Sequence, residues 1–576
     1  MGRFMLLAVI CFVSVTEAFS QDYLDAVLFL TGASSLEELD AEVLERYDAL
    51  ASRPVRINTA TESRLVASGL FSRYQAASIA DYRRSSGDIL SIAELALLDG
   101  FGDAAAQAMA PFVSFGTQAP PGRSSLEKER VETEIMARSA VQVQEGEGTG
   151  SHAVKVRTGD EDRWLLSVAA KQASLKPAWP PDALSASAVI HGRKRPGKVI
   201  LGDFNTRFGQ GLLLWSGFSL SGVQSAAAMD KHPAGLSPAW TLSPDAVHRG
   251  AAADMSLGRF VLSGFWSYGK CSGANLTWLA RSGQIGMTAI IPAPVISTPV
   301  IQSEAKDLYP RFSIDYRWSI RKTDLFGEAA WDLTSRSVAF LAGGAWNIAY
   351  QVRLAASVRN YPASFDGSLA GALRSSTRTS DERGAALAFD CKALTVTADA
   401  ALHPDKGTAQ YKTIWKYAPK LTESLSLSFR AVGRYRPADP YPWRGEVRAE
   451  AAITSGSGLS LKGSGTLCHN IETSWLTYVE GGYVDESSKR KLTLFLRGTA
   501  FKIDRWDDRI YIYERDIPGA FSVPAYYGRG CSASAVASVK RRHFSFHART
   551  YFTAYPGMAG QKPYRAGLKL QLQFSL

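Results

Sequence analysis

The sequence predicts a mainly β protein, a large antiparallel transmembrane β-barrel that follows a small all-α domain. Three observations carry this prediction. From residues 126–576 apolar and polar residues alternate with a period of two, as in strands with one buried face. Residues 22–115 instead repeat apolar residues at helical spacing. The N-terminal stretch reads as a secretion signal, and no later apolar run reaches the length of a transmembrane helix.

The last thirteen residues, YRAGLKLQLQFSL from Tyr564 to Leu576, alternate most clearly. Every even position carries an apolar or aromatic side chain, and every odd position carries a polar, charged or glycine residue. In a membrane barrel one face of each strand meets lipid and the other meets the lumen. We therefore expect Leu568 and Phe574 to face lipid, and this strand to close the barrel against the first one.

The same alternation recurs in GRFVLSGFWSYG, RFSIDYRWSI, KLTLFLRGTAF and HFSFHARTYF. A large soluble β-sandwich or propeller would also alternate, but it could use shorter strands. Arginine and glutamate inside strands, on the face opposite the apolar one, favour a barrel with a hydrated lumen. A strand and turn of about 25 residues predicts roughly 14–18 strands for the barrel.

Residues 1–20 are predicted to be a signal peptide. Arg3 precedes a short apolar run, and a small-x-small cleavage site ends at Ala18. This indicates an exported protein, and with the barrel it indicates the outer membrane of a Gram-negative bacterium. The remaining cysteines are too far apart in sequence for a disulfide framework or a zinc motif. They are Cys271, Cys391, Cys468 and Cys531.

Residues 21–115 are predicted to form the helical domain. SSLEELDAEVLERYDALAS places Ser35 and Glu38 at capping-box spacing and repeats leucine at helical intervals. YQAASIADYRRSSG reads as a helix that ends at Gly87. Residues 116–125, GTQAPPGRSS, read as a linker because they are rich in glycine, proline and serine.

Within this domain residues 57–113, from INTATESRL to APFV, resemble a tandem helix-hairpin-helix module of the ComEA type, found in competence proteins that receive DNA. In that family two glycines allow a tight turn whose N–H groups, with the following helix, hold a DNA phosphate. The second hairpin, LDGFG, keeps both glycines, whereas the first keeps one and has Phe71 in place of the other. The resemblance implies DNA contact by Gly69, Gly100, Phe101, Gly102, Arg73, Arg83 and Arg84.

The net charge of the helical domain argues against strong DNA binding. Residues 22–115 hold seven arginines, no lysine and fourteen acidic residues, a net charge of −7 that lies in residues 22–52. Non-specific DNA binding depends mostly on phosphate neutralisation by lysine and arginine. We therefore expect weak binding of double-stranded DNA, and a compact plug or a protein-docking unit remains the alternative role.

The remaining residues, 116–576, hold fifty-seven basic and thirty-nine acidic residues, a net charge of +18. Lipid excludes this charge, so it must lie in the lumen, the loops or the rims. We interpret it as a solvated basic surface, with attraction to lipopolysaccharide or to an anionic cargo as alternatives.

The joint layout resembles a group of largely uncharacterised outer-membrane proteins of Bacteroidetes-type bacteria. The segments that carry this resemblance are LGDFNTRFGQGLLLWSGFS, VHRGAAAD, the stretch 360–390 and the stretch 509–530. Physically, Gly209 and Gly211 suit a bend where a barrel strand turns inward. The resemblance implies little about activity.

No sequence motif indicates an enzyme, a metal site or a cofactor. GxSxG, HExxH and P-loop patterns are absent from the sequence, and the eight histidines are scattered. We expect an outer-membrane barrel whose helical domain, on the periplasmic side, serves macromolecule binding or passage, with DNA as the implied cargo. The alternative is a non-transporting structural or assembly protein whose helical domain docks a periplasmic protein. The expected partners are therefore outer-membrane lipid and either DNA or that protein.

Overall fold

The computed structural model describes residues 19–116, 131–556 and 563–576, apart from residues 145, 161–162, 175, 177–178, 193–196, 244–245, 294–308, 350, 423 and 488–489. The predicted signal peptide, except for its last two residues, lies outside the described residues. So do all but the first residue of the predicted linker and the first five residues of the predicted barrel region.

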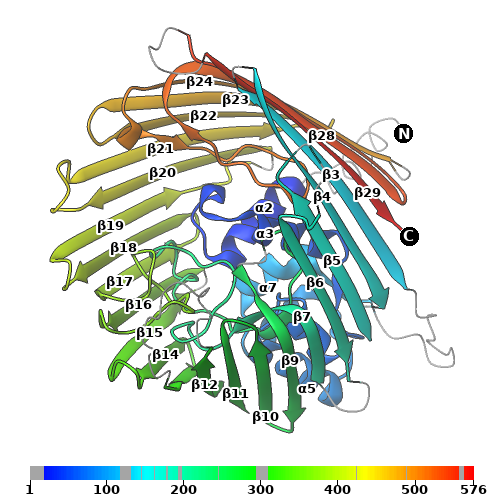
Figure 1. Cartoon of the computed structure of the whole chain (residues 1–576), viewed down its shortest axis with the longest axis vertical. Coiled ribbons are helices and arrows are strands. Elements are labelled where there is room, and N and C mark those ends of the chain that lie inside the picture. The colour runs from blue at the N-terminus through cyan, green and yellow to red at the C-terminus, as the bar shows by residue number, and fades with distance from the viewer. Residues whose placement is uncertain are drawn as a thin grey trace, which may run out of the picture.

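Twenty-four antiparallel strands close into a barrel, which confirms the predicted fold class (Figure 1). The last strand pairs with the first, with Leu572 opposite Ala137, so the barrel has no free edge. Figure 1 shows the helices inside the ring of strands. The strands of the wall are β3 Glu132–Gln144, β4 Glu147–Asp160, β5 Trp164–Gln172, β6 Ala183–His191, β7 Gly197–Arg207, β9 His248–Leu257, β10 Phe260–Ser267, β11 Cys271–Ala280, β12 Gly283–Pro292, β13 Arg311–Ile320, β14 Thr323–Asp332, β15 Ser337–Ala349, β16 Val352–Tyr361, β17 Glu382–Cys391, β18 Leu394–His403, β19 Thr408–Tyr417, β20 Leu425–Tyr435, β21 Trp443–Thr454, β22 Leu459–His469, β23 Thr473–Ser487, β24 Arg490–Ile503, β27 Gly528–Arg541, β28 Phe544–Ala554 and β29 Tyr564–Ser575.

The predicted range of 14–18 strands is too low. It assumed about 25 residues for each strand and its turn. Consecutive strands in part of the wall begin only eleven or twelve residues apart, at Phe260, Cys271 and Gly283, because two- or three-residue turns join them. Alternation fixes which face a residue occupies, but it does not show where one strand ends and the next begins.

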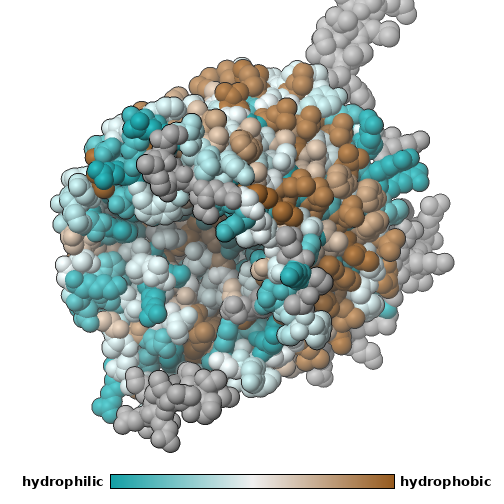
Figure 2. Space-filling model, turned by 45° about the horizontal axis from the view of Figure 1, so that its top comes forward, coloured by the Kyte–Doolittle hydropathy of each residue, from teal (hydrophilic) through white to brown (hydrophobic). Residues whose placement is uncertain are grey.

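The outer face of the barrel is apolar, as the alternation predicted. Leu568 and Phe574 are 45% and 41% exposed, whereas Gln571 on the inner face is 2% exposed. Figure 2 shows hydrophobic side chains gathered over the outer wall and hydrophilic ones around the hollowed end. This face would contact membrane lipid and indicates an outer-membrane location. Among the described residues, no helix is long and apolar enough to cross a membrane.

The helical domain consists of short helices around one apolar core. Its core includes Ile57, Leu65, Ile79 and Phe112, each no more than 1% exposed. A two-stranded parallel sheet joins Val55–Arg56, before the hairpins, to Val113–Ser114, after them. The elements are α2 Phe19–Thr31, η1 Leu36–Glu38, α3 Ala41–Ser52, β1 Val55–Arg56, α4 Glu62–Ala67, α5 Arg73–Ser85, α6 Ile92–Leu97, α7 Asp103–Met109, η2 Ala110–Phe112 and β2 Val113–Ser114.

One predicted helix start is wrong. Ser35 caps only the short η1 and makes no side-chain capping bond. The helix begins after Asp40, whose carboxylate accepts the Val43 N–H at 2.9 Å. Asp40 supplies the acceptor that an N-cap needs, so the chain makes a separate turn before it. The helix predicted to end at Gly87 does so, since α5 ends at Ser85 and Gly87 has a φ of 95°.

Three long connections fold into the lumen, and all arise from the rim opposite the start of β3 at Glu132 and the end of β29 at Ser575. They are residues 208–247, 362–381 and 504–527, which follow β7, β16 and β24. Counting from β3, these are the fifth, thirteenth and twenty-first strands of the wall, so the inward loops are evenly spaced around it. They contain the short strands β8 Gly235–Pro238, β25 Ile510–Tyr511 and β26 Ala525–Tyr526, and the turn η4 Trp506–Asp508.

The first inward loop shows how such a loop is held. Gly209 and Gly211 have φ of 56° and 80°, which confirms the predicted bend after β7. The buried carboxylate of Glu328 on β14 accepts the N–H groups of Gln210 and Leu212 at 2.8 and 2.9 Å. A Cβ on Gly209 would lie 2.6 Å from that carboxylate, so only glycine fits there.

Candidate functional site: a helical plug inside the barrel

The helical domain, residues 19–116, is a plug in the lumen, and its contacts with the wall are mostly polar. Ser63 on α4 lies 2.9 Å from the His191 ring at the end of β6. Tyr74 on α5 donates to the carbonyl of Arg281 at 2.6 Å. Direct apolar packing of the helices on the wall is small, at Tyr74, Val261 and Leu279. An interface of this kind is typical of two parts that can separate, rather than of one continuous hydrophobic core.

Arg73 is the strongest single anchor of this plug. Its guanidinium is 4% exposed and donates to Ser263, Asn275 and Thr277 on β10 and β11, at 2.6 to 3.2 Å. It also lies over the Phe208 ring at 5.3 Å. The sequence suggested Arg73 as a DNA contact, but in this arrangement its donors face the wall.

The acidic part of the plug meets cations of the wall. Glu45 on α3 lies 2.6 Å from Lys155 on β4. Glu37 lies 2.6 Å from Arg448 on β21, and Glu38 lies 3.4 Å from Arg430 on β20. Part of the basic charge therefore faces inward and neutralises the plug, where the sequence analysis favoured a solvated surface.

Burial alone would raise the pKa of Glu37, but two neighbours reverse that effect. The Arg448 guanidinium and the N–H of Tyr513, which donates at 3.0 Å, lower the pKa of Glu37 to about 2. Arg448 also donates to the carbonyl of Tyr511 at 3.0 Å. One wall arginine thus connects the plug with the inward loop 504–527.

The same loop packs against the plug core. Tyr513 and Phe521 lie against it, and their rings are 5.7 Å apart. Close by, the Tyr23 hydroxyl donates to Asp48 at 2.6 Å. Burial raises the pKa of Asp48 to about 6, although the Tyr23 hydroxyl and a backbone N–H at Gly519 act to lower it. This carboxylate therefore changes its charge near pH 6.

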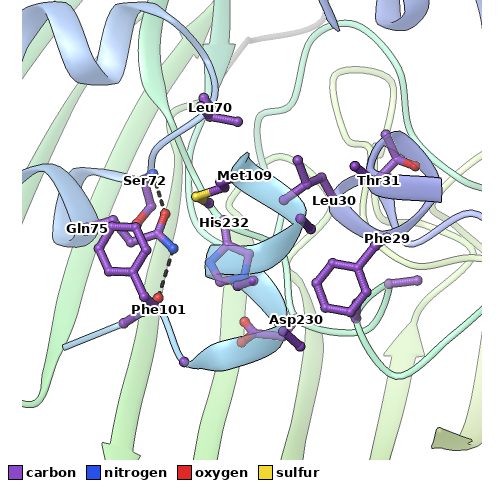
Figure 3. A pocket seen from close by; sticks show the side chains of 18 of the residues that line it. Phe29, Leu30, Thr31, Leu70, Ser72, Gln75, Phe101, Met109, Asp230 and His232 are labelled. Carbon is purple, nitrogen blue, oxygen red and sulfur yellow. Dashed lines mark hydrogen bonds between the residues drawn. The ribbon is translucent and has the colours of Figure 1, made fainter. Parts of the chain in front are cut away.

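A cavity of about 1260 Å³ lies between the plug, the inward loop 208–247 and the wall. The turn residues Arg321, Gln351 and Lys392 in its lining lie at the rim where β3 begins and β29 ends. Burial lowers the pKa of Lys231 to about 7, so the arginines supply most of the positive charge around the cavity. Figure 3 shows the cavity between Phe29, Leu30, Thr31, Leu70, Ser72, Gln75, Phe101, Met109, Asp230 and His232.

The second predicted hairpin lines this cavity. Gly100, Phe101 and Gly102 have the expected tight turn, with φ of 86° at Gly100 and 79° at Gly102. A Cβ on Gly100 would lie 2.7 Å from the Tyr74 ring, whereas one on Gly102 would meet no atom within 4 Å. The N–H groups of Phe101 and Gly102 already donate inside the turn, to Leu98 and Ala96. Only the side of the turn at Gly102 is therefore open.

The other predicted residues are spread over the plug. Gly69, with a φ of 70°, keeps the first hairpin turn and also lines the cavity. Arg83 donates to the carbonyl of Ala60 at 2.7 Å, which holds the plug together. Arg84 is exposed and pairs with Asp81. The structure thus brings the two hairpin turns to one cavity but leaves the three arginines elsewhere.

Sequence reasoning missed the residues that hold the plug: Glu37, Glu38, Glu45 and their wall partners. The signal that could have found them is the opposite net charge of the two regions, −7 against +18. Within the described part of the chain, no three His, Cys, Asp or Glu residues lie together as metal ligands would.

Comparison with known proteins agrees with the hairpins. Residues 51–114 match the model of the helix-hairpin-helix motif. No curated protein sequence matches the chain. Similar solved structures include the outer membrane protein OprD from Pseudomonas aeruginosa, at 9% identity, 77% coverage of this chain, 92% of that chain and a TM-score of 0.29. OccAB3 from Acinetobacter baumannii has 8% identity, 77% and 99% coverage and a TM-score of 0.28. The P pilus usher (PapC) translocation pore has 7% identity, 77% and 99% coverage and a TM-score of 0.32. At these values the structures carry no argument about function.

Proposed function

We propose that this protein is a gated outer-membrane conduit in which the helical plug is both the gate and the docking unit for a macromolecule. The observation that carries the proposal is that the plug lies in the lumen and is held to the wall mainly by ion pairs and hydrogen bonds. Charged contacts of this kind depend on salt and pH, so they can be broken without unfolding either part. A plug meant only to close the barrel would be more stable with an apolar interface.

We infer that the cavity mouth faces the periplasm. Strands on that side are joined by turns as short as residues 258–259, 281–282 and 321–322, whereas the long inward loops leave the opposite rim. Outer-membrane barrels have short periplasmic turns and longer extracellular loops. A periplasmic ligand would thus meet the hairpins at Gly69 and Gly102 first.

DNA is the proposed cargo, because the helix-hairpin-helix motif is the part of the chain that matches a known module. The accessible members of the predicted site are Gly102 and Arg84. Asp99 and Asp103 flank the open turn, so we expect weak, salt-sensitive binding.

The gate is tested by single-channel conductance of the full chain in planar bilayers. The triple variant Glu37→Gln, Glu38→Gln, Glu45→Gln should open far more often than wild type, since it removes the negative partner of three wall cations. The matched control neutralises three acidic plug residues that, in the described part of the chain, form no ion pair with the wall: Asp81→Asn, Asp99→Asn and Asp103→Asn. Equal conductance in wild type and the triple variant would contradict the gate.

DNA docking is tested by a gel shift of the full chain in detergent with duplex DNA across salt concentrations. Gly102→Ala should weaken any complex, because it adds a Cβ on the open side of the turn. Gly87→Ala is the control, since Gly87 also has positive φ and open space but lies outside the hairpins. Absence of a complex at low salt, or equal loss in both variants, would remove DNA from the proposal.

A second candidate function is docking of a periplasmic protein. Leu90 and Leu97, beside and on α6, are 61% and 84% exposed, so both side chains are accessible to a partner protein. Photo-crosslinking from position 97 in intact cells would favour this function if it gave a discrete protein adduct that Leu90→Ser abolished, while the triple variant left conductance unchanged.

A further inference from the structure

The inner wall carries a row of three cations directly opposite one another. Lys416 on β19 pairs in register with Arg430 on β20, and Arg430 pairs with Arg448 on β21. Lys416 lies on the inner face, because its neighbours Trp415 and Tyr417 point outward and are 54% and 50% exposed. Like charges directly opposite across a sheet destabilise it unless something neutralises them.

A second row repeats the pattern four residues away. Lys412, Arg434 and Arg444 are also opposite one another on the same three strands. Four residues along a strand span about 13 Å, so the second row lies nearer the rim from which the inward loops leave. The six cations form a stripe, here called the basic stripe, that runs along the lumen wall.

The plug neutralises only part of the basic stripe. Glu37 and Glu38 pair with Arg448 and Arg430, the two cations of the deeper row that it reaches. The wall itself adds Glu446, which lies 3.5 Å from Arg448 and 3.7 Å from Arg430. Arg444 donates instead to the backbone carbonyls of Asp507 and Arg509 on the inward loop. Among the described residues, the remaining three cations, Lys412, Lys416 and Arg434, have no carboxylate within 4.0 Å, and all three are half-buried rather than sealed.

We propose that the basic stripe is a binding surface for a nucleic-acid strand, and that the acidic segment of the plug, residues 25–48, occupies it as an intramolecular competitor. This inference rests on the gated conduit proposed above. It names the ligand of that conduit and the event that releases the plug. A strand carries one negative charge per nucleotide, so it can neutralise the three cations that the plug leaves unpaired. The exchange of plug carboxylates for phosphates would then release the plug only when a polyanion is present.

Charge reversal of the competitor tests this directly. The full chain in detergent is titrated with a fluorescent oligothymidylate of about 30 nucleotides, several times a typical single-strand site. Glu37→Lys with Glu38→Lys should bind at least about tenfold more tightly than wild type, with a salt slope of about −4 for six neutralised phosphates. Glu37→Gln with Glu38→Gln is the milder version, and the faster migration of unheated folded barrel on a gel shows that each variant is intact.

Neutralising the stripe should have the opposite effect. Lys412→Gln, Lys416→Gln and Arg434→Gln, added to the Glu37→Gln, Glu38→Gln chain, should weaken binding about tenfold and reduce the salt slope by about 2. The control neutralises three exposed cations elsewhere, Lys322→Gln, Arg336→Gln and Lys540→Gln.

Three results would overturn the inference. Binding unchanged by either competitor variant would mean that the plug does not compete. Equal binding by the stripe variant and its control would mean that the stripe is not the surface. Dextran sulfate that binds more tightly than the oligonucleotide at equal charge would remove nucleic acid as the ligand. Each result leaves the conductance test of the gate intact, so failure of this inference and failure of the proposed function can be told apart.

Discussion

The ion pair between Glu37 and Arg448 should set how often the plug leaves the wall. Burial raises the pKa of Glu37, but Arg448 and the N–H of Tyr513 outweigh it and bring the pKa from its ordinary value of 4.5 to about 2. A difference of about 2.5 pKa units corresponds to about 3 kcal/mol in favour of the docked, ionised state. Glu37→Gln keeps the shape of the side chain but removes its charge, so undocking should become about a hundredfold more favourable.

Thiol labelling can measure that change. Ser63→Cys places a nearly isosteric thiol that is buried against His191 and far in sequence from Glu37. It is introduced into a chain in which all native cysteines are alanine. When closing is faster than labelling, the labelling rate reports the fraction of plug that is open. Glu37→Gln should raise the rate about a hundredfold, whereas Glu94→Gln, also on the plug, should not.

The pH dependence follows from the sign of the shift. Because docking lowers the pKa of Glu37, its contribution is present above pH 4.5 and is lost as the pH falls toward 2. Labelling of the wild-type chain should accelerate over that range, and Glu37→Gln should remove this part of the acceleration. Equal labelling of wild type and Glu37→Gln at neutral pH would refute the assignment of the ion pair as the latch.

Three further changes separate the other contacts of the plug. Asp48→Asn should stabilise the docked plug at neutral pH by up to about 3 kcal/mol and flatten labelling between pH 4 and 6, because a raised pKa opposes docking once the group ionises; faster labelling would contradict this. Gly100→Ala should lower the plug's resistance to protease strongly, since its Cβ would lie 2.7 Å from Tyr74 in a left-handed turn; a native digestion pattern would contradict this. Arg73→Met should speed labelling about a hundredfold or more, because it removes the guanidinium that donates to Ser263 and Thr277; conductance and labelling as in wild type would show that Arg73 is not an anchor.

Much of the barrel could be predicted from the sequence because the alternation of apolar and polar residues along a strand is a local pattern. A period of two assigned Leu568 and Gln571 to opposite faces, and the two faces are indeed apolar and buried polar. The alternation could not predict the number of strands, because a tight turn such as 281–282 interrupts it very little. Glycines at 209 and 211 were informative because their conformation is itself local.

The position of the helical domain could not be predicted in the same way. Arg73 and Asn275 are about two hundred residues apart in the chain, and neither has an unusual local sequence. The hairpin pattern identified Gly100 and Gly102 correctly as turn glycines, but it could not show that Gly100 is needed for packing on Tyr74. Only the opposite net charges of the two regions pointed to their contact, and net charge does not reveal which residues meet.

The last prediction concerns the ion pair between Glu37 and Arg448. It asks whether these charges are needed to keep the plug docked or only to let it undock. Replacing a buried ion pair by well-packed apolar residues is often neutral or stabilising, whereas removing one partner is costly. Glu37→Met with Arg448→Met should therefore keep the plug docked, while Arg448→Met alone should open it. The double variant should also lose the acid-induced labelling between pH 4.5 and 2, because the titrating carboxylate is gone. A double variant that opens as readily as the single one would mean that charge is needed for holding, and that the wall does not use ion pairs to make the closed state reversible.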